Sequence, residues 1–183
     1  MTTKGLSTLD TDTIHTDIER QFVGCLLWLP THHARRVLTG MRTDDLANPM
    51  SAHVLQLVIE LVTAGHDPAP VAVHSHAVAT GRAPGEHRRS WLGKWLTDTY
   101  GASQATTPNQ AHWLKAVVLE TTWRRAIAEH ARRLLQAVEH SATDLLAELV
   151  DDTCHIDELW GRYQAALNPA DSSDIARALR EVA

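Results

Sequence analysis

The sequence of 183 residues predicts an all-α protein: a compact N-terminal bundle of about five short helices, followed by a long antiparallel helical hairpin. Apolar residues recur every three or four positions, and the apolar runs begin at capping residues and end at glycine or proline. The one valine-rich run with strand propensity, residues 71–81, has no candidate partner strand nearby. Between residues 109 and 140 no glycine or proline interrupts the chain.

Four parts are expected along the chain. Residues 1–13 are rich in threonine and aspartate and predict a flexible arm, and residues 14–106 predict the helical globule. Residues 107–167 predict the hairpin, and residues 168–183 a polar linker or tail. Hydrophobic residues make up 44% of the chain and charged residues 21%, which is typical of a folded domain rather than a disordered chain.

The first helix is predicted to begin at Thr16, with Glu19 three residues later completing a capping box. Pro30 ends it, because proline lacks the backbone donor and disfavours helix in the residue before it. Residues 31–40 predict a short second helix. The apolar stripe of the first helix comprises Ile18, Phe22, Val23, Leu26 and Leu27.

Three further helices complete the predicted globule. Asn48 is a good cap, Pro49 suits the first helical position, and Gly65 is a natural stop. Residues 71–81 predict a short helix, and residues 90–101 predict another. Most tryptophans are expected to face the core: Trp91, Trp95, Trp113 and Trp123.

The hairpin is predicted from two long helices with a very short connection. Thr107 caps the first helix, and Thr143 caps the second, which is expected to continue to Leu167. Helices joined by so few residues run antiparallel. The stripe expected to contact the second helix has coiled-coil-like spacing: Trp123, Ile127, Ala131, Leu134 and Val138.

The second hairpin helix carries more large apolar residues than one partner helix covers. Large aromatic side chains on a two-helix hairpin need additional cover, and a second subunit supplies it. We therefore predict a homodimer or higher oligomer. The residues expected at its interface are Leu149, Ile156, Trp160 and Tyr163.

Two arginine doublets lie on the first hairpin helix: Arg124, Arg125, Arg132 and Arg133. They form either the solvated flank of the hairpin or a contact for an acidic partner or a phosphate backbone. The net charge of −5 argues against nucleic acid as the main partner, so contact with DNA is expected to be weak or indirect. The alternative function is a nucleic-acid-binding regulator that uses these arginines.

A search for catalytic chemistry gives no candidate residue. Gly93-Lys94 lacks the rest of a phosphate-binding loop, because Arg88 and Trp95 stand where that loop needs glycine and a hydroxyl residue. His74 and His76 are not followed by a second pair at metal-ligand spacing. We therefore expect no catalytic residues, no metal and no cofactor.

The cysteines and the termini bear on location. Cys25 and Cys154 fall in predicted helices without a CxxC pair, so we expect buried, reduced thiols. The N-terminus lacks the apolar region of a signal peptide, and no apolar run is long enough to span a membrane. These features favour the cytoplasm and no membrane association.

Three segments, in this order along the chain, match a known succession of motifs. The first is "IERQFVGCLLWLP" at 18–30, where Glu19, Gln21, Gly24, Leu26 and Leu27 match. The second is "TDDLANPMSAHVLQLVIELVTAGHDPAPVAVHSHAV" at 43–78, which aligns Asp44, Asp45, His53, Leu57, Leu61, Gly65 and Pro68. The third is "WLTDTYGASQATTPNQAHWLKAVVLETTWRRAI" at 95–127, with Asn109, Trp113, Val117, Glu120 and Arg125.

In this succession the chain resembles the N-terminal domain of bacterial DnaB-type replicative DNA helicases. The resemblance covers about residues 14 to 167 and implies an α-helical domain without chemistry of its own. In that family the domain dimerises through its hairpin, and three dimers form a collar that docks primase and helicase-loading factors. The family's ATP-dependent motor is absent from this sequence, so we expect a fragment of a helicase or a free-standing relative. The implied partners are primase, helicase or a helicase loader.

Overall fold

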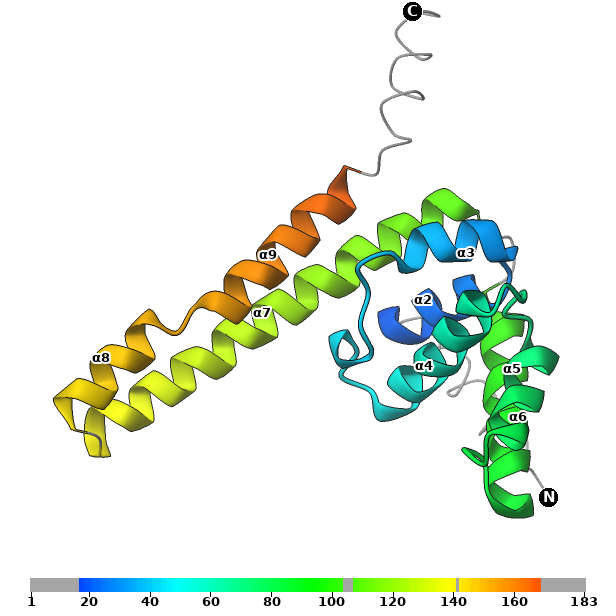
Figure 1. Ribbon diagram of the computed structural model, residues 1–183, viewed down its shortest axis with the longest axis horizontal. Coiled ribbons are helices and arrows are strands. Elements are labelled where there is room, and N and C mark those ends of the chain that lie inside the picture. Colours follow the sequence, from blue (N-terminus) through cyan, green and yellow to red (C-terminus); the bar gives the residue numbers. More distant parts are fainter. Residues whose placement is uncertain (1–16, 104–106, 141, 169–183) are drawn as a thin grey trace, which may run out of the picture. The chain divides into compact units, whose positions relative to one another are not determined.

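The computed structural model describes residues 17–103, 107–140 and 142–168. Within these ranges every regular element is helical, which confirms the predicted all-α fold class (Figure 1). The predicted arm, 1–13, and all but the first residue of the predicted tail, 168–183, lie outside the described residues. The elements are α2 (Ile18–Leu26), α3 (Thr31–Leu38), the 3-10 helix η1 (Thr43–Asp45), α4 (Pro49–Thr63), α5 (Pro70–Ala79), α6 (Gly85–Ala102), α7 (Pro108–His140), α8 (Thr143–Asp151) and α9 (Cys154–Leu167).

The chain divides into two compact units, residues 1–118 and residues 119–183. The long helix α7 crosses this division, so its first turns belong to the first unit and the remainder to the second. The division therefore lies inside the segment 107–167 that the sequence assigns to the hairpin. The first unit contains α2 to α6, and the second contains α8 and α9.

The start of α2 is fixed by two carboxylates. Asp17 is the N-cap, one residue later than predicted, and its side chain accepts a hydrogen bond of 3.0 Å from the backbone N–H of Arg20. The capping box predicted between Thr16 and Glu19 lies partly outside the described residues, but Glu19 has a second role. It accepts hydrogen bonds from the backbone N–H groups of Ala47 and Asn48, at 2.7 and 2.8 Å, and so ties α2 to the start of α4.

The α2 and α6 helices approach each other closely at Gly24. A Cβ atom at this position would lie 2.0 Å from the Oγ of Ser103 and 3.1 Å from the backbone oxygen of Thr99, so only glycine fits. Beyond this contact, the indole of Trp28 stacks on the ring of Tyr100, with centroids 3.9 Å apart, and donates a hydrogen bond to the Tyr100 carbonyl. These contacts hold the end of α2 against α6.

Both ends of α4 are where the sequence predicts them. The Asn48 side chain accepts hydrogen bonds from the backbone N–H groups of Met50 and Ser51, and Pro49 is the first helical residue. Gly65 ends the helix with a φ of +87°. Its N–H and that of the next residue donate back to carbonyls of the last turn, which is the Schellman arrangement.

The valine-rich run forms the predicted short helix, α5, and Gly81, with a φ of +72°, ends it. Helix α6 begins at Gly85, five residues before the predicted start at residue 90. Leu92 is buried as expected, but Trp91 is 53% exposed. Adjacent residues point about 100° apart around a helix, so burying the Leu92 face leaves Trp91 outside. Trp113 is also exposed, so the expectation that these two tryptophans face the core is wrong.

The second arm of the predicted hairpin is not one long helix. It breaks at Asp152, whose φ of −77° and ψ of 66° form an inverse γ-turn, with a 2.9 Å hydrogen bond from the Thr153 N–H to the Asp151 carbonyl. The Thr153 hydroxyl then donates to the Asp157 carboxylate in the first turn of α9. Aspartate and threonine compete for backbone groups through their own side chains, which favours an interruption here.

In the second unit the arm formed by α8 and α9 runs back along α7 (Figure 1). Two contacts set the register. The rings of Trp123 and Trp160 have centroids 4.8 Å apart, and the Arg133 guanidinium lies 3.9 Å from the Asp152 carboxylate. The returning arm is therefore antiparallel to α7.

Candidate functional site

Three of the four residues predicted at an oligomer interface share one face of α9. Ile156, Trp160 and Tyr163 follow one another at spacings of four and three residues. Trp160 is 43% exposed, and the other two are half-buried. Leu149 lies on α8 and is also half-buried, but the break at Asp152 separates it from the α9 face.

The face of α7 that is buried differs from the predicted stripe. The most buried positions of α7 in the second unit are Leu119, Thr122, His130 and Ala137. The predicted stripe lies beside this line, and three of its members, Ile127, Ala131 and Val138, are exposed. Leu135, which the prediction did not include, is 70% exposed, and Val138 is 67% exposed. Beyond Leu119 the buried line consists of small and polar residues, so a search for large apolar residues selected the neighbouring line.

Apolar side chains that remain at least partly exposed form a stripe on α7 and another on α9. The ring contact between Trp123 and Trp160 joins the two stripes, and the remaining members follow at helical spacing on either helix. We call this surface the apolar flank. It consists of Trp123, Ile127, Leu135 and Val138 on α7 and of Ile156, Trp160, Tyr163 and Leu167 on α9.

Helix α8 has no buried residue. Leu145 and Val150 are largely exposed, although both are large aliphatic side chains. A helix of nine residues without a buried side chain depends on further contacts for its stability, because short helices are marginal by themselves. The tip of the hairpin is therefore another apolar surface that its own unit leaves uncovered.

The four arginines predicted as a partner contact do not form one patch. Adjacent residues of a helix point about 100° apart, so Arg124 and Arg133 lie on different sides of α7 from the line shared by Arg125 and Arg132. Arg124 is paired with Glu120, with a shortest N–O distance of 2.7 Å. Arg133 lies near Asp152 and contacts the buried ring of His130 at 3.5 Å.

The histidine pair of α5 has partners of its own. His74 contacts the backbone carbonyl of Arg89 at 3.1 Å, and His76 contacts Glu60 at 2.8 Å. The pKa of Glu60 lies below its usual value, first because of the hydrogen bond from Gln56 and then because of His76 and Arg82. Over the described ranges no group of three or more histidine, cysteine or acidic residues is arranged to hold a metal ion.

The two cysteines are free and differ in exposure. Cys25 is buried in α2, as expected, whereas Cys154 is exposed at the first position of α9. The expectation of two buried thiols is therefore wrong for Cys154. The break before α9 makes this residue part of a helix end, where few neighbours cover it.

No helix in the described part of the chain is long and apolar enough to cross a membrane. Comparison of the chain with models of known protein families, with curated proteins and with solved structures gives no match.

Proposed function

We propose that this chain is a protein-interaction and oligomerisation module of the DNA replication machinery, built like the helicase N-terminal collar that docks primase and loader. The exposed apolar flank of the second unit is the observation that supports oligomerisation. The sequence resemblance is the reason for assigning the chain to DNA replication. No part of the proposal requires a catalytic residue or a cofactor.

The apolar flank has the composition of an interface centre. Interface centres are depleted in charge and enriched in aromatic residues, and the flank has Trp123, Trp160 and Tyr163 beside aliphatic side chains. Burying one large apolar side chain is worth about 1.5–3 kcal/mol. Several such residues on one face, including Leu135 and Val138, therefore favour association with a second copy of the same face.

The alternative, a nucleic-acid-binding regulator, has less support. Its arginines are distributed around α7, and two of them, Arg124 and Arg133, lie near carboxylates. The net charge of −5 also opposes binding to a polyanion. Salt separates the two functions: phosphate contacts weaken steeply as salt rises, whereas apolar association does not.

The test is the molar mass in solution, measured by light scattering over the micromolar concentration range and at two salt concentrations. The parent chain should exceed the monomer mass at both. Trp160→Ala combined with Tyr163→Ala should shift the mass toward the monomer. Trp113→Ala is the matched control, because Trp113 is an exposed tryptophan of the first unit and should leave the mass unchanged.

A second variant distinguishes loss of association from loss of folding. Leu135→Glu with Val138→Glu changes two side chains that are already largely exposed, so the helical content should be unaffected. A charged pair within an apolar interface should nevertheless abolish association, because neither charge finds a partner there. A monomeric parent, or a double variant with the parent's mass, would refute the proposed interface.

A further inference from the structure

The first unit contains a cavity of about 380 Å³ between α4, the turn that follows α5, and α6. This volume lies within the range of small-molecule sites, which is about 300–1,000 Å³. All of its walls belong to the first unit. The lining residues are Met50, His53, Arg82, Ala83, His87, Arg88, Trp91 and Leu92.

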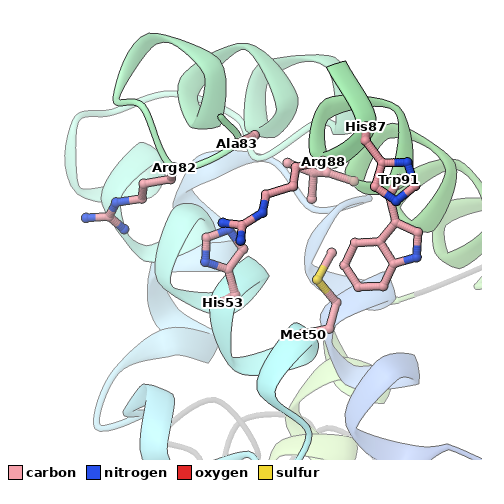
Figure 2. Close-up of a pocket in the computed structure, with 8 residues that line it drawn as sticks. Met50, His53, Arg82, Ala83, His87, Arg88 and Trp91 are labelled. Carbon is pink, nitrogen blue, oxygen red and sulfur yellow. The ribbon is translucent and has the colours of Figure 1, made fainter. Parts of the chain in front are cut away.

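One wall of the cavity is basic, and none of its lining residues is acidic. Arg82 is neutralised by Glu60, at 2.6 Å. The side chain of Arg88 forms no hydrogen bond or ion pair with any described residue. Figure 2 shows its guanidinium reaching from α6 toward His53 on α4, whereas Arg82 points away from them. Arg88 therefore presents an unneutralised positive charge at the cavity.

His53 adds a polar ring to the same wall. It is half-buried, and its ring nitrogens have no hydrogen-bond partner among the described residues. Burial lowers the pKa of His53, and the positive charge of Arg82 lowers it further, against an opposing effect of Glu60. The ring is accordingly neutral at pH 7 and has one N–H to donate. A half-buried polar ring without a partner is costly unless a ligand or water satisfies it.

The other wall is apolar and flat. Met50, Trp91 and Leu92 line it, and Trp91 is more than half exposed although it belongs to a well-packed helix. An indole face beside a thioether is a good surface for a planar ring, because aromatic and sulfur–aromatic contacts are both favourable. The cavity thus offers a place for charge and a place for a flat apolar group.

We propose that this cavity binds a small organic anion with a planar apolar body. Arg88 and His53 hold its carboxylate or phosphate, and Trp91 with Met50 holds the planar group. Guanidinium groups match both oxyanions with paired N–H donors. This site lies in the first unit and is independent of association through the apolar flank.

Four probes test the proposal on the full chain by isothermal titration calorimetry. Phenyl phosphate and phenylacetate carry both features, inorganic phosphate carries only the charge, and benzyl alcohol carries only the ring. Phenyl phosphate and phenylacetate should each bind with a stoichiometry of one to one. The tighter of the two should have a Kd of about 1 mM, which is ordinary for ligands of this size. Which of them binds more tightly shows whether the site prefers a phosphate or a carboxylate. Phosphate and benzyl alcohol should bind at least about tenfold more weakly, the equivalent of one lost charged hydrogen bond.

Two matched pairs of variants locate the site. Arg88→Gln should weaken the better aromatic anion by about tenfold or more, whereas Arg89→Gln, an exposed neighbour outside the cavity, should not. Trp91→Ala should weaken the aromatic anions but leave inorganic phosphate unchanged, and Trp113→Ala should change neither. Equal affinities of the Arg88 variant and the parent would overturn the proposal. Failure of both aromatic anions to saturate the protein by about 10 mM would do the same.

Discussion

The indole of Trp123 in α7 lies against that of Trp160 in α9, with ring centroids 4.8 Å apart and planes inclined by 41°. Tyr163 continues the cluster, with its ring centroid 5.6 Å from that of Trp160. This contact joins the two arms of the second unit and leaves part of Trp160 in solvent. The same residue thus contributes to the packing of the arms and to the surface proposed for association.

The Trp123–Trp160 contact should be measurable as a coupling energy. Trp123→Ala should lower the free energy of unfolding by about 1–3 kcal/mol, less than a fully buried aromatic because both rings are partly exposed. A double-mutant cycle with Trp160→Ala should give a coupling of about 0.5–1.5 kcal/mol in urea unfolding. Trp123→Phe should cost less than the alanine variant, because the buried indole N–H has no hydrogen-bond partner among the described residues. Additive effects of the two alanine variants would contradict the contact.

Gly24→Ala should destabilise the first unit by about 1–3 kcal/mol, because the new methyl group collides with Ser103 where α2 meets α6. Gly101→Ala is the control on α6: nothing lies within 4 Å of its added Cβ, and alanine favours the helix. Thermal unfolding followed by circular dichroism should show a lower midpoint for the first variant and an equal or higher midpoint for the second. Ser103→Gly should rescue Gly24→Ala in part. Equal midpoints for Gly24→Ala and the parent would contradict the close approach.

Stability should fall as the pH falls from about 7 to about 5, because histidines with lowered pKa values bind fewer protons when folded. Burial is the first cause of the lowered pKa at both His53 and His112, which lie below the usual value of 6.5. At His112 the positive charges of Lys115, Arg36 and His33 add to it. Below 6.5 the unfolded chain gains protons that the folded chain resists, so the loss begins there.

The measurement for this prediction is the free energy of unfolding in urea at several pH values. His53→Gln with His112→Gln should reduce the loss on acidification, because both variants remove a histidine with a lowered pKa. The Glu60 and Asp67 carboxylates also have lowered pKa values, but their contributions are lost only in more acidic solution, below about 4.5. An identical pH slope in the parent and the double variant would contradict the assignment.

Arg132→Glu with Arg133→Glu should abolish capture of a replication partner, because exposed charges set the choice and orientation of partners. The melting temperature should fall only modestly, because the pair that Arg133 forms with Asp152 at 3.9 Å is exposed and exposed pairs contribute little to stability. The measurement is recovery of primase or helicase from a cell extract. Arg88→Glu with Arg89→Glu carries the same change in charge on α6 and should recover as much partner as the parent. If the Arg88 and Arg89 variant lost the partner while the Arg132 and Arg133 variant kept it, the contact would lie on the first unit.

Local signals in the sequence predicted most helix boundaries of the first unit. Asn48 and Pro49 begin α4, Gly65 and Gly81 end α4 and α5, and the Thr107 hydroxyl caps α7 at Gln110. Such signals depend on backbone geometry within a few residues, so they can be recognised without the tertiary structure.

The sequence did not predict which face of α7 is buried, nor which residues from different helices meet at the cavity. The buried line of α7 contains Thr122, His130 and Ala137, which no hydrophobic pattern selects. The cavity beside Trp91 combines α4 and α6, and the sequence gives no spacing rule that pairs Arg88 with His53. The break at Asp152 was not predicted, because no glycine or proline marks it in the sequence. A γ-turn and a side-chain hydrogen bond produce it instead.

The inverse γ-turn at Asp152 also divides the second unit into segments of unequal protection. Helix α9 buries Leu159 and Ala166, whereas α8 buries no residue at all. The amides of α8 should therefore exchange with deuterium through local opening. The free energy of this opening should be lower than for the amides of α9 or of the facing part of α7. A segment that opens separately can refold against a partner without disrupting the Trp123–Trp160 contact. We therefore expect the tip of the hairpin to exchange as a separate unit, and a partner that binds α8 should slow the exchange of its amides.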